Sequence, residues 1–222
     1  MRSAAAVRTQ VHPRARRLSL RVDVSTGCVV LVRPRRASAA LVAAFLADKR
    51  AWIEKQLAAL PERTVLGDDV TLPVLGEPHR VRAVPAARRG VWAEDGVIHV
   101  SGAPEHLGRR LTDWLKGEAR RTYAAWAREF AARLNVKVTR VAVRDTSSRW
   151  GSCTRDGRLS LSWRLMLAPR AVAAYVVAHE VAHLKHMNHS AAFWRVVAAL
   201  VGDTDAPRAW LRRHGAELHR YV

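Results

Sequence analysis

The residues with the clearest chemical potential are His179, Glu180 and His183, which form the pattern HExxH. On an α-helix the two histidines, four residues apart, stand on one face, so both imidazoles can bind one metal ion. Glu180 is rotated by about 100° from His179 and can reach a water molecule at that ion. The spacing therefore predicts a catalytic zinc site in which Glu180 acts as the general base.

The surroundings of these residues favour a metal site over a solvated polar cluster. Between Ala171 and Leu184 they are the only charged or titrating side chains apart from one tyrosine. HExxH also occurs by chance, and a lone helical histidine is more often an ordinary polar residue than a ligand. A buried carboxylate without a partner would cost several kcal/mol, however, and a divalent cation with its water compensates all three groups.

A catalytic zinc site needs a third protein ligand and an open fourth position, and His186 and His189 are the candidates. On a continuing helix His186 would lie about 10.5 Å from His179 along the axis, too far for a shared ion. Asn188 tolerates the left-handed conformation that ends helices, and a turn there would return His189 to the metal. We therefore predict His189 as the third ligand, with His186 solvated or supporting a ligand.

The segment SSRWGSC, which ends at Cys153, is a candidate for substrate binding. An edge strand can pair with an extended substrate, and Gly151 would let another backbone approach closely. We predict Trp150, Gly151 and Ser152 as substrate-binding residues; alternatively, Trp150 is core and Gly151 a bulge. Cys153 is expected to be a small buried thiol. Four side chains are candidates for stabilising the oxyanion: Arg149, Tyr175, His214 and Tyr221.

The elements that position these residues follow from hydrophobic periodicity. Pro169 is expected to open the histidine helix, and Ser190 to cap a further helix that Gly202 closes, with Phe193 and Trp194 packing the His189 turn. RLSLSWRL alternates as a strand and forms a hairpin with SSRWGSC. Ahead of them, a long helix is predicted from Pro104 to Leu134, with Asn135 as its stop.

The first hundred residues are predicted to be rich in β-structure. LSLRVD and CVVLV form a β-hairpin around a glycine turn, Ser38 caps one amphipathic helix over residues 39–60, and short antiparallel strands follow between Val65 and Ser101. The fold class expected is α+β. A β-rich subdomain over residues 1–102 packs on a catalytic subdomain over residues 103–222.

Composition restricts the function classes. The net charge of +19 suggests a nucleic-acid partner, but the excess is almost wholly arginine and alanine is abundant, as GC-rich coding bias would also give. Two distant cysteines, Cys28 and Cys153, argue against a disulfide scaffold. No apolar run is long enough for a membrane span or a signal peptide, so we expect a cytoplasmic protein without membrane contact. The sequence does not indicate an oligomeric state.

Together these motifs resemble the YgjP-like metallopeptidase family, relatives of SprT-type zinc proteases in the zincin group. RWGSC and YVVAHEVAHLKHMNHSAAFW carry the resemblance, with RARRLSLRVD and AWIEKQL near the N-terminus. It implies a zincin-like catalytic unit in which His179, His183 and His189 bind Zn²⁺ and Glu180 is the catalytic acid and base. The pattern also resembles metzincins, but those carry glycine where this chain has His186.

Zinc-dependent hydrolysis of a protein or peptide substrate is therefore the expected function. A metal-dependent amidase acting on a non-protein substrate would use the same four residues. From another class, the chain could be a polyanion-binding protein with a structural or non-catalytic zinc site. Glu180 argues against that alternative, because structural sites are closed by four ligands and need no adjacent carboxylate.

Overall fold

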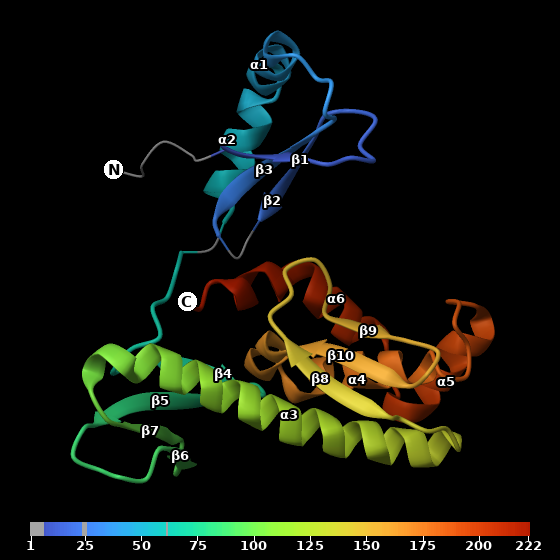
Figure 1. Ribbon diagram of the computed structural model, residues 1–222. Helices are drawn as coiled ribbons and strands as arrows, with labels where there is room; N and C mark the ends of the chain where they lie inside the picture. The colour runs from blue at the N-terminus through green and yellow to red at the C-terminus, as the bar shows by residue number, and fades with distance from the viewer. Residues whose placement is uncertain (1–6, 24–25, 61) are drawn as a thin grey trace. The chain divides into compact units, whose positions relative to one another are not determined.

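The computed structural model describes residues 7–23, 26–60 and 62–222 (Figure 1). Its contacts divide the chain into two compact units, residues 1–62 and 63–222. This division differs from the boundary predicted between residues 102 and 103. The reason is a shared core, in which Leu72 and Ile98 from the middle strands are buried in one cluster with Leu111 of the following helix.

The first unit contains a three-stranded sheet in the order β1-β3-β2. Strand β2 (Ser19–Asp23) pairs antiparallel with β3 (Cys28–Arg33), which is the predicted hairpin. Strand β1 (Val7–Val11), which the sequence reading did not predict, pairs with β3 in parallel. Strand β3 is therefore the central strand, with a hydrogen-bonded neighbour on each side. Its residues Val29 and Leu31 are fully buried.

Two helices, α1 (Ala39–Asp48) and α2 (Arg50–Ala58), follow this sheet. The predicted cap is present, since Ser38 Oγ accepts a hydrogen bond from Leu41 N at 3.2 Å. The prediction of one continuous helix is wrong, because Lys49 leaves the helical region with φ −92° and ψ 5°. Neither proline nor glycine marks this break, so the periodicity carries no signal of it.

The second unit opens with a four-stranded sheet in the order β4-β5-β7-β6. Its strands are β4 (Thr71–Val74), β5 (Glu77–Val84), β6 (Val91–Glu94) and β7 (Val97–Ser101). Strands β5 and β7 pair in parallel, so the prediction of purely antiparallel strands is wrong. The physical reason is that β6 takes the outer position and leaves β7 to pair with β5.

A single long helix, α3 (Leu107–Leu134), contacts strands of both sheets of the second unit (Figure 1). A 3₁₀ turn, Pro104–His106, precedes it, and Asn135 ends it in the left-handed conformation with φ 49°. Both ends agree with the prediction. At about 1.5 Å per residue the helix is about 42 Å long, which is enough to run under both sheets.

The second sheet of this unit has the order β8-β10-β9, which leaves β9 at one edge. Its strands are β8 (Arg140–Arg144), β9 (Gly151–Cys153) and β10 (Arg158–Ser162), followed by a 3₁₀ helix, η2 (Trp163–Leu167). The remaining helices are α4 (Arg170–Ala182), α5 (Ala191–Val201), α6 (Asp205–His214) and the 3₁₀ helix η3 (Gly215–His219).

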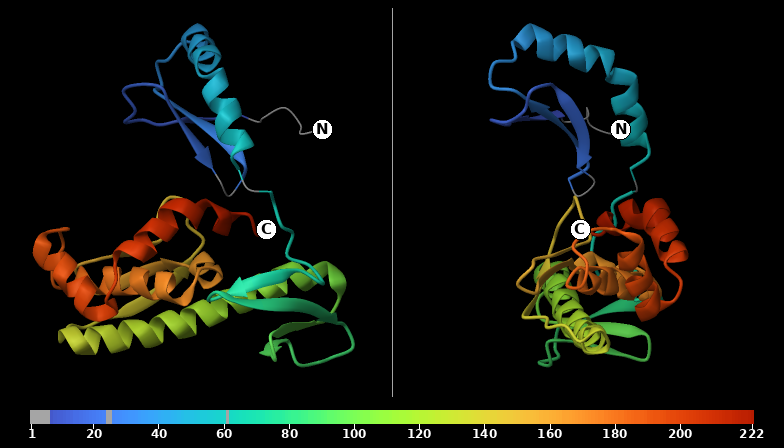
Figure 2. Two further views of the ribbon diagram at one scale, coloured as in Figure 1. Left: turned by 180° about the vertical axis from the view of Figure 1, so that it is seen from behind. Right: turned by 90° about the vertical axis from the view of Figure 1, so that its right-hand side faces the viewer.

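The α+β expectation is confirmed: both sheets precede the helices α4 to α6 along the chain. Figure 2 shows α4 to α6 gathered beside the β8-β10-β9 sheet. Among the described helices, none combines the length and apolar character needed to cross a membrane.

Candidate metal centre

Helix α4 carries His179 on a buried, mostly apolar surface. Pro169 immediately precedes the helix, as predicted, and α4 packs against α3, α5 and β9. Val177 and Val181 are fully buried in the core of the unit. Because the helix is fixed on several sides, His179 and His183 are held one turn apart at its C-terminal end.

After His183 the chain turns back toward α4 without a left-handed residue at Asn188. Positive φ angles outside glycine occur, among the described residues, only at Asp69, Leu75, Asp95 and Asn135. The predicted conformation of Asn188 is therefore wrong. Its side chain instead accepts a hydrogen bond from Ser190 N at 3.4 Å, and Ser190 Oγ accepts from Phe193 N at 3.4 Å to cap α5. Capping thus fixes the position of His189.

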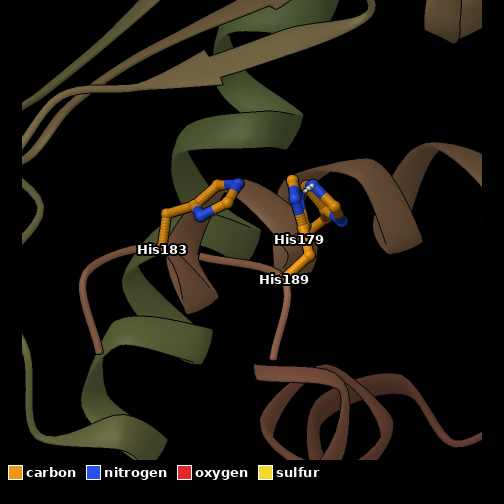
Figure 3. Close-up of side chains that lie close together, drawn as sticks. All are labelled: His179, His183 and His189. Atoms are coloured by element: carbon orange, nitrogen blue, oxygen red, sulfur yellow. Dashed lines mark hydrogen bonds between the residues drawn. The ribbon is translucent and has the colours of Figure 1, made fainter. Parts of the chain in front are cut away.

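The three predicted ligands converge (Figure 3). One ring nitrogen from each of His179, His183 and His189 lies within 4.8 Å of the others. The Nε2 atoms of His179 and His189 are 3.2 Å apart. Two nitrogens bound tetrahedrally to zinc at 2.0–2.1 Å lie about 3.3–3.4 Å apart, so this spacing suits a shared ion. The donor set therefore fits zinc.

The orientation of the His183 ring is set by a backbone group. Its Nδ1 lies 3.2 Å from the carbonyl oxygen of His186, to which an Nδ1–H donates. This hydrogen bond leaves Nε2 of His183 without a proton and available for a metal. The backbone of His186 thus orients a predicted ligand.

Aromatic side chains form the apolar base of the site. The fully buried ring of Phe193 lies 4.9, 4.7 and 4.9 Å from the rings of His179, His183 and His189. The indole of Trp194 stacks on His189 at 5.7 Å with an interplanar angle of 26°. This packing agrees with the predicted supporting role of both residues.

Burial adjusts the acid–base properties of the site in directions that suit catalysis. Burial, and secondarily the charges of His183 and His189, lower the pKa of His179 to about 4, so its ring is neutral at physiological pH. Burial raises the pKa of Glu180 to about 7, against a smaller opposing effect of Arg149. A neutral imidazole is the form that binds metal, and a carboxylate with a pKa near 7 is suited to proton transfer.

Strand β9 lies directly against Glu180. A Cβ atom added at Gly151 would lie 2.5 Å from Oε1 of Glu180 and 2.7 Å from its Cγ, so any larger residue would displace the strand or the Glu180 side chain. The register with β10 is continuous from Gly151 to Cys153, which gives no support to the alternative of a bulge. Trp150 is half-buried, with its ring 5.3 Å from that of His219.

Cys153 and the candidate oxyanion residues take different positions. Burial, then the charge of Glu180, raises the pKa of the half-buried Cys153 thiol to about 11, as expected for an unreactive cysteine. Tyr175 lies beside the site, with its ring 5.9 Å from that of His179. His214 is engaged with Glu217 through a 3.0 Å contact.

Sequence reasoning missed two arginines that the structure places close to this region. The guanidinium of Arg208 lies 4.6 Å above the ring of Trp194 and brings positive charge near the histidines. Arg164, only 5% exposed, binds the carboxylate of Asp145. Arg164 interrupts the apolar run SLSWRLML, and the argument applied to the histidines would have identified it.

Comparisons with known proteins identify the family of this chain. The family model for the YgjP-like metallopeptidase domain matches residues 16–214. Among solved structures, the chain is similar to the metallopeptidase zymogen of Pyrococcus abyssi abylysin, with 21% identity and a TM-score of 0.38. That similarity covers 45% of this chain and 98% of the other. No curated protein matches the sequence.

Proposed function

This chain belongs to the YgjP-like metallopeptidase family, and from this premise we propose that it is a zinc-dependent peptidase with His179, His183 and His189 as the metal ligands. The observation that carries the proposal is that one nitrogen from each of these three imidazoles lies within 4.8 Å of the others. The buried Glu180 directly follows His179 on the same helix. A neutral three-histidine set leaves a fourth position open, as catalytic zinc requires.

The reaction depends on proton transfer by Glu180. A bound zinc ion would lower the pKa of water and polarise the scissile carbonyl. Glu180 would accept a proton from the attacking water and deliver it to the leaving amide nitrogen as the C–N bond breaks. Its burial keeps bulk water from competing for this proton. At the same site, Tyr175 and Arg149 remain the candidate donors to the oxyanion.

We infer that an extended peptide would pair with β9. In the antiparallel β9–β10 ladder, Ser162 N donates to Trp150 O at 2.9 Å, so residues with even numbers on β9 bond to β10. The N–H and C=O of Gly151 therefore point away from β10, toward the free edge beside Glu180. Gly151 would bind the substrate backbone, and the side chain of Ser152 would lie next to it.

The substitution Glu180→Gln tests this function. We expect the variant to keep about one zinc per chain and to lose about 10²- to 10⁴-fold of its casein-cleaving activity, because only proton transfer is removed. Since the pKa of Glu180 is raised to about 7, the wild-type rate should fall as the pH drops below this region. Bound zinc would shift this fall to lower pH, because a nearby cation favours the carboxylate. Unchanged cleavage by the variant would contradict the assignment.

The amidase alternative makes a different prediction. A zinc-loaded protein that hydrolyses small amides but neither casein nor unfolded peptides would be an amidase on a non-protein substrate. The edge of β9 with which no described strand pairs favours the peptidase, since it offers a polypeptide backbone the hydrogen bonds that a small amide does not need. A structural-zinc protein would cleave neither substrate class.

A further inference from the structure

Most arginines of the first unit lie in a stretch of sequence that contains almost no acidic residues. From Val7 to Ala47 the sequence holds eight arginines and one acidic residue, Asp23. Arg33 donates a hydrogen bond to the carbonyl of Ala37. The other seven are exposed, and no ion pair within the described ranges includes them. We call these seven the arginine surface: Arg8, Arg14, Arg16, Arg17, Arg21, Arg35 and Arg36.

The strand topology brings most of the arginine surface to one end of the sheet. Because β1 and β3 are parallel, they end together, with Val11 opposite Arg33. The antiparallel β2 begins at the same end. The two connections that leave this end, residues 12–18 and 34–38, carry five of the seven arginines. Asp23 is the last residue of β2 and therefore lies at the opposite end.

The other two arginines lie on the sheet face away from the helices. Arg8 and Arg21 both pair with Val30, so the three residues form one row across the sheet. Leu20, the neighbour of Arg21, lines a hollow with Phe45 of α1, so the opposite face is the one that the helices cover. Figure 2 shows both helices on one side of this sheet. The arginine surface therefore continues from the end of the sheet onto the face that the helices do not cover, where Arg8 and Arg21 are exposed on either side of the buried Val30.

We propose that the arginine surface binds the phosphate backbone of double-stranded nucleic acid without reading its sequence. Guanidinium groups match phosphate oxygens in a bidentate geometry. No Phe, Tyr or Trp occurs between Val7 and Ala44, so the surface offers no platform on which unpaired bases could stack. Side chains on a strand stand roughly perpendicular to the sheet, so Arg8 and Arg21 point away from its face and not along the strands. A flat membrane in contact with the arginines at the end of the sheet would therefore not reach these two. A duplex backbone, which curves around its axis, can contact both groups.

This activity goes beyond peptide hydrolysis, because every residue of the metal centre lies in the second unit. Binding of a labelled 30-base-pair duplex to the full chain, measured by fluorescence anisotropy, tests it. If all seven arginines contact phosphates, affinity should fall about 10³- to 10⁴-fold between 50 and 200 mM KCl. The triple variant Arg14→Gln, Arg16→Gln, Arg17→Gln should lose three contacts and show a fall of only about 10²-fold.

A matched triple variant in the second unit provides the control. Arg88→Gln, Arg120→Gln and Arg128→Gln remove the same charge from exposed positions and should leave the salt dependence unchanged. The triple variant Arg14→Lys, Arg16→Lys, Arg17→Lys keeps the positive charge and should bind at low salt, which separates the effect of charge from an effect on folding. The proposal is overturned if both glutamine triple variants weaken binding equally, or if duplex is not bound at 50 mM KCl. It is also overturned if a 30-nucleotide oligo-dT or phosphatidylserine vesicles compete better than unlabelled duplex. Casein cleavage should be the same in all variants, so failure here would leave the peptidase proposal intact.

Discussion

His183 and His189 depend on different neighbours for their positions. His183 is oriented through the carbonyl of His186, whereas His189 is placed by the turn that Ser190 caps and by stacking on Trp194. The orientation of the His183 ring should tolerate replacement of the His186 side chain, because the backbone carbonyl of residue 186 is present in any variant. The two candidate third ligands should therefore respond oppositely to substitution.

We expect His189→Ala to lose most bound zinc and His186→Ala to keep it. The first change removes one of three converging nitrogens, and the second removes a ring while leaving the carbonyl that orients His183. Metal analysis of the purified variants after dialysis against a weak chelator measures the difference. Zinc retained by His189→Ala and lost by His186→Ala would reverse the ligand assignment.

Gly151 controls the gap between β9 and Glu180, the proposed general base. In Gly151→Ala the new methyl group would meet the Glu180 carboxylate, so either the strand or the carboxylate must move. Because displacement of catalytic groups by about 1 Å can cost about 10²-fold, we expect kcat/KM to fall about ten- to a hundredfold with zinc content unchanged. Gly117→Ala on α3, where an added Cβ meets only a distant arginine side chain, is the matched control. Equal activity of the two variants would count against a catalytic role for this contact.

At the scale of elements, Arg164 joins three segments around the site. Its guanidinium binds Asp145, the residue after β8, at 2.7 and 3.3 Å, and donates to the carbonyls of Leu218 and Tyr221 at 3.0 and 2.9 Å. Asp145 lies just before the loop that leads into β9. The segment after α6, which includes η3, is held in place by these hydrogen bonds. His219 of this segment packs on Trp150, the residue before β9, so the segment supports the start of β9.

Arg164→Met should destabilise the protein by about 2–4 kcal/mol, because it leaves buried carbonyl groups without donors and removes charge-assisted hydrogen bonds. Arg121→Met on α3, whose ion pair with Glu118 is largely exposed, should change stability by less than about 0.5 kcal/mol. Urea unfolding followed by circular dichroism measures both values. Similar values for the two variants would show that the brace contributes little.

Local signals made part of the fold and the candidate site predictable from sequence. The caps at Ser38 and Ser190, the stop at Asn135 and the HExxH spacing depend on a few neighbouring residues, and each was found where expected. The break at Lys49 and the parallel pairing of β5 with β7 depend on tertiary packing, which periodicity does not encode. The return of His189 was predicted, but through the wrong residue conformation.

At the scale of the molecule, the metal centre and the main hydrophobic core share one unit. The core cluster begins at Leu66 and includes residues of α3, α4 and α5, so nothing in it comes from residues 1–62. The arginine surface belongs wholly to the other unit. The two proposed activities are therefore assigned to separate parts of the chain.

A fragment spanning residues 63–222 should consequently fold and bind about one zinc, because it keeps its complete core and all three histidines. It should also lose the salt-dependent duplex binding of the full chain. Zinc content, circular dichroism and anisotropy measured on the fragment check these outcomes. A fragment that is unfolded would show that the first unit contributes to the stability of the second.

The connection from His183 to His189 has a further consequence for how this chain can vary in length. Two of the proposed ligands, His179 and His183, stand one turn apart at the end of α4, and the third, His189, follows six residues after His183, just before the cap of α5. One inserted or deleted residue displaces the chain by about 3.8 Å, more than a zinc–nitrogen bond of about 2 Å can absorb. Residues 184–188 should therefore accept changes of side chain far more readily than insertions or deletions.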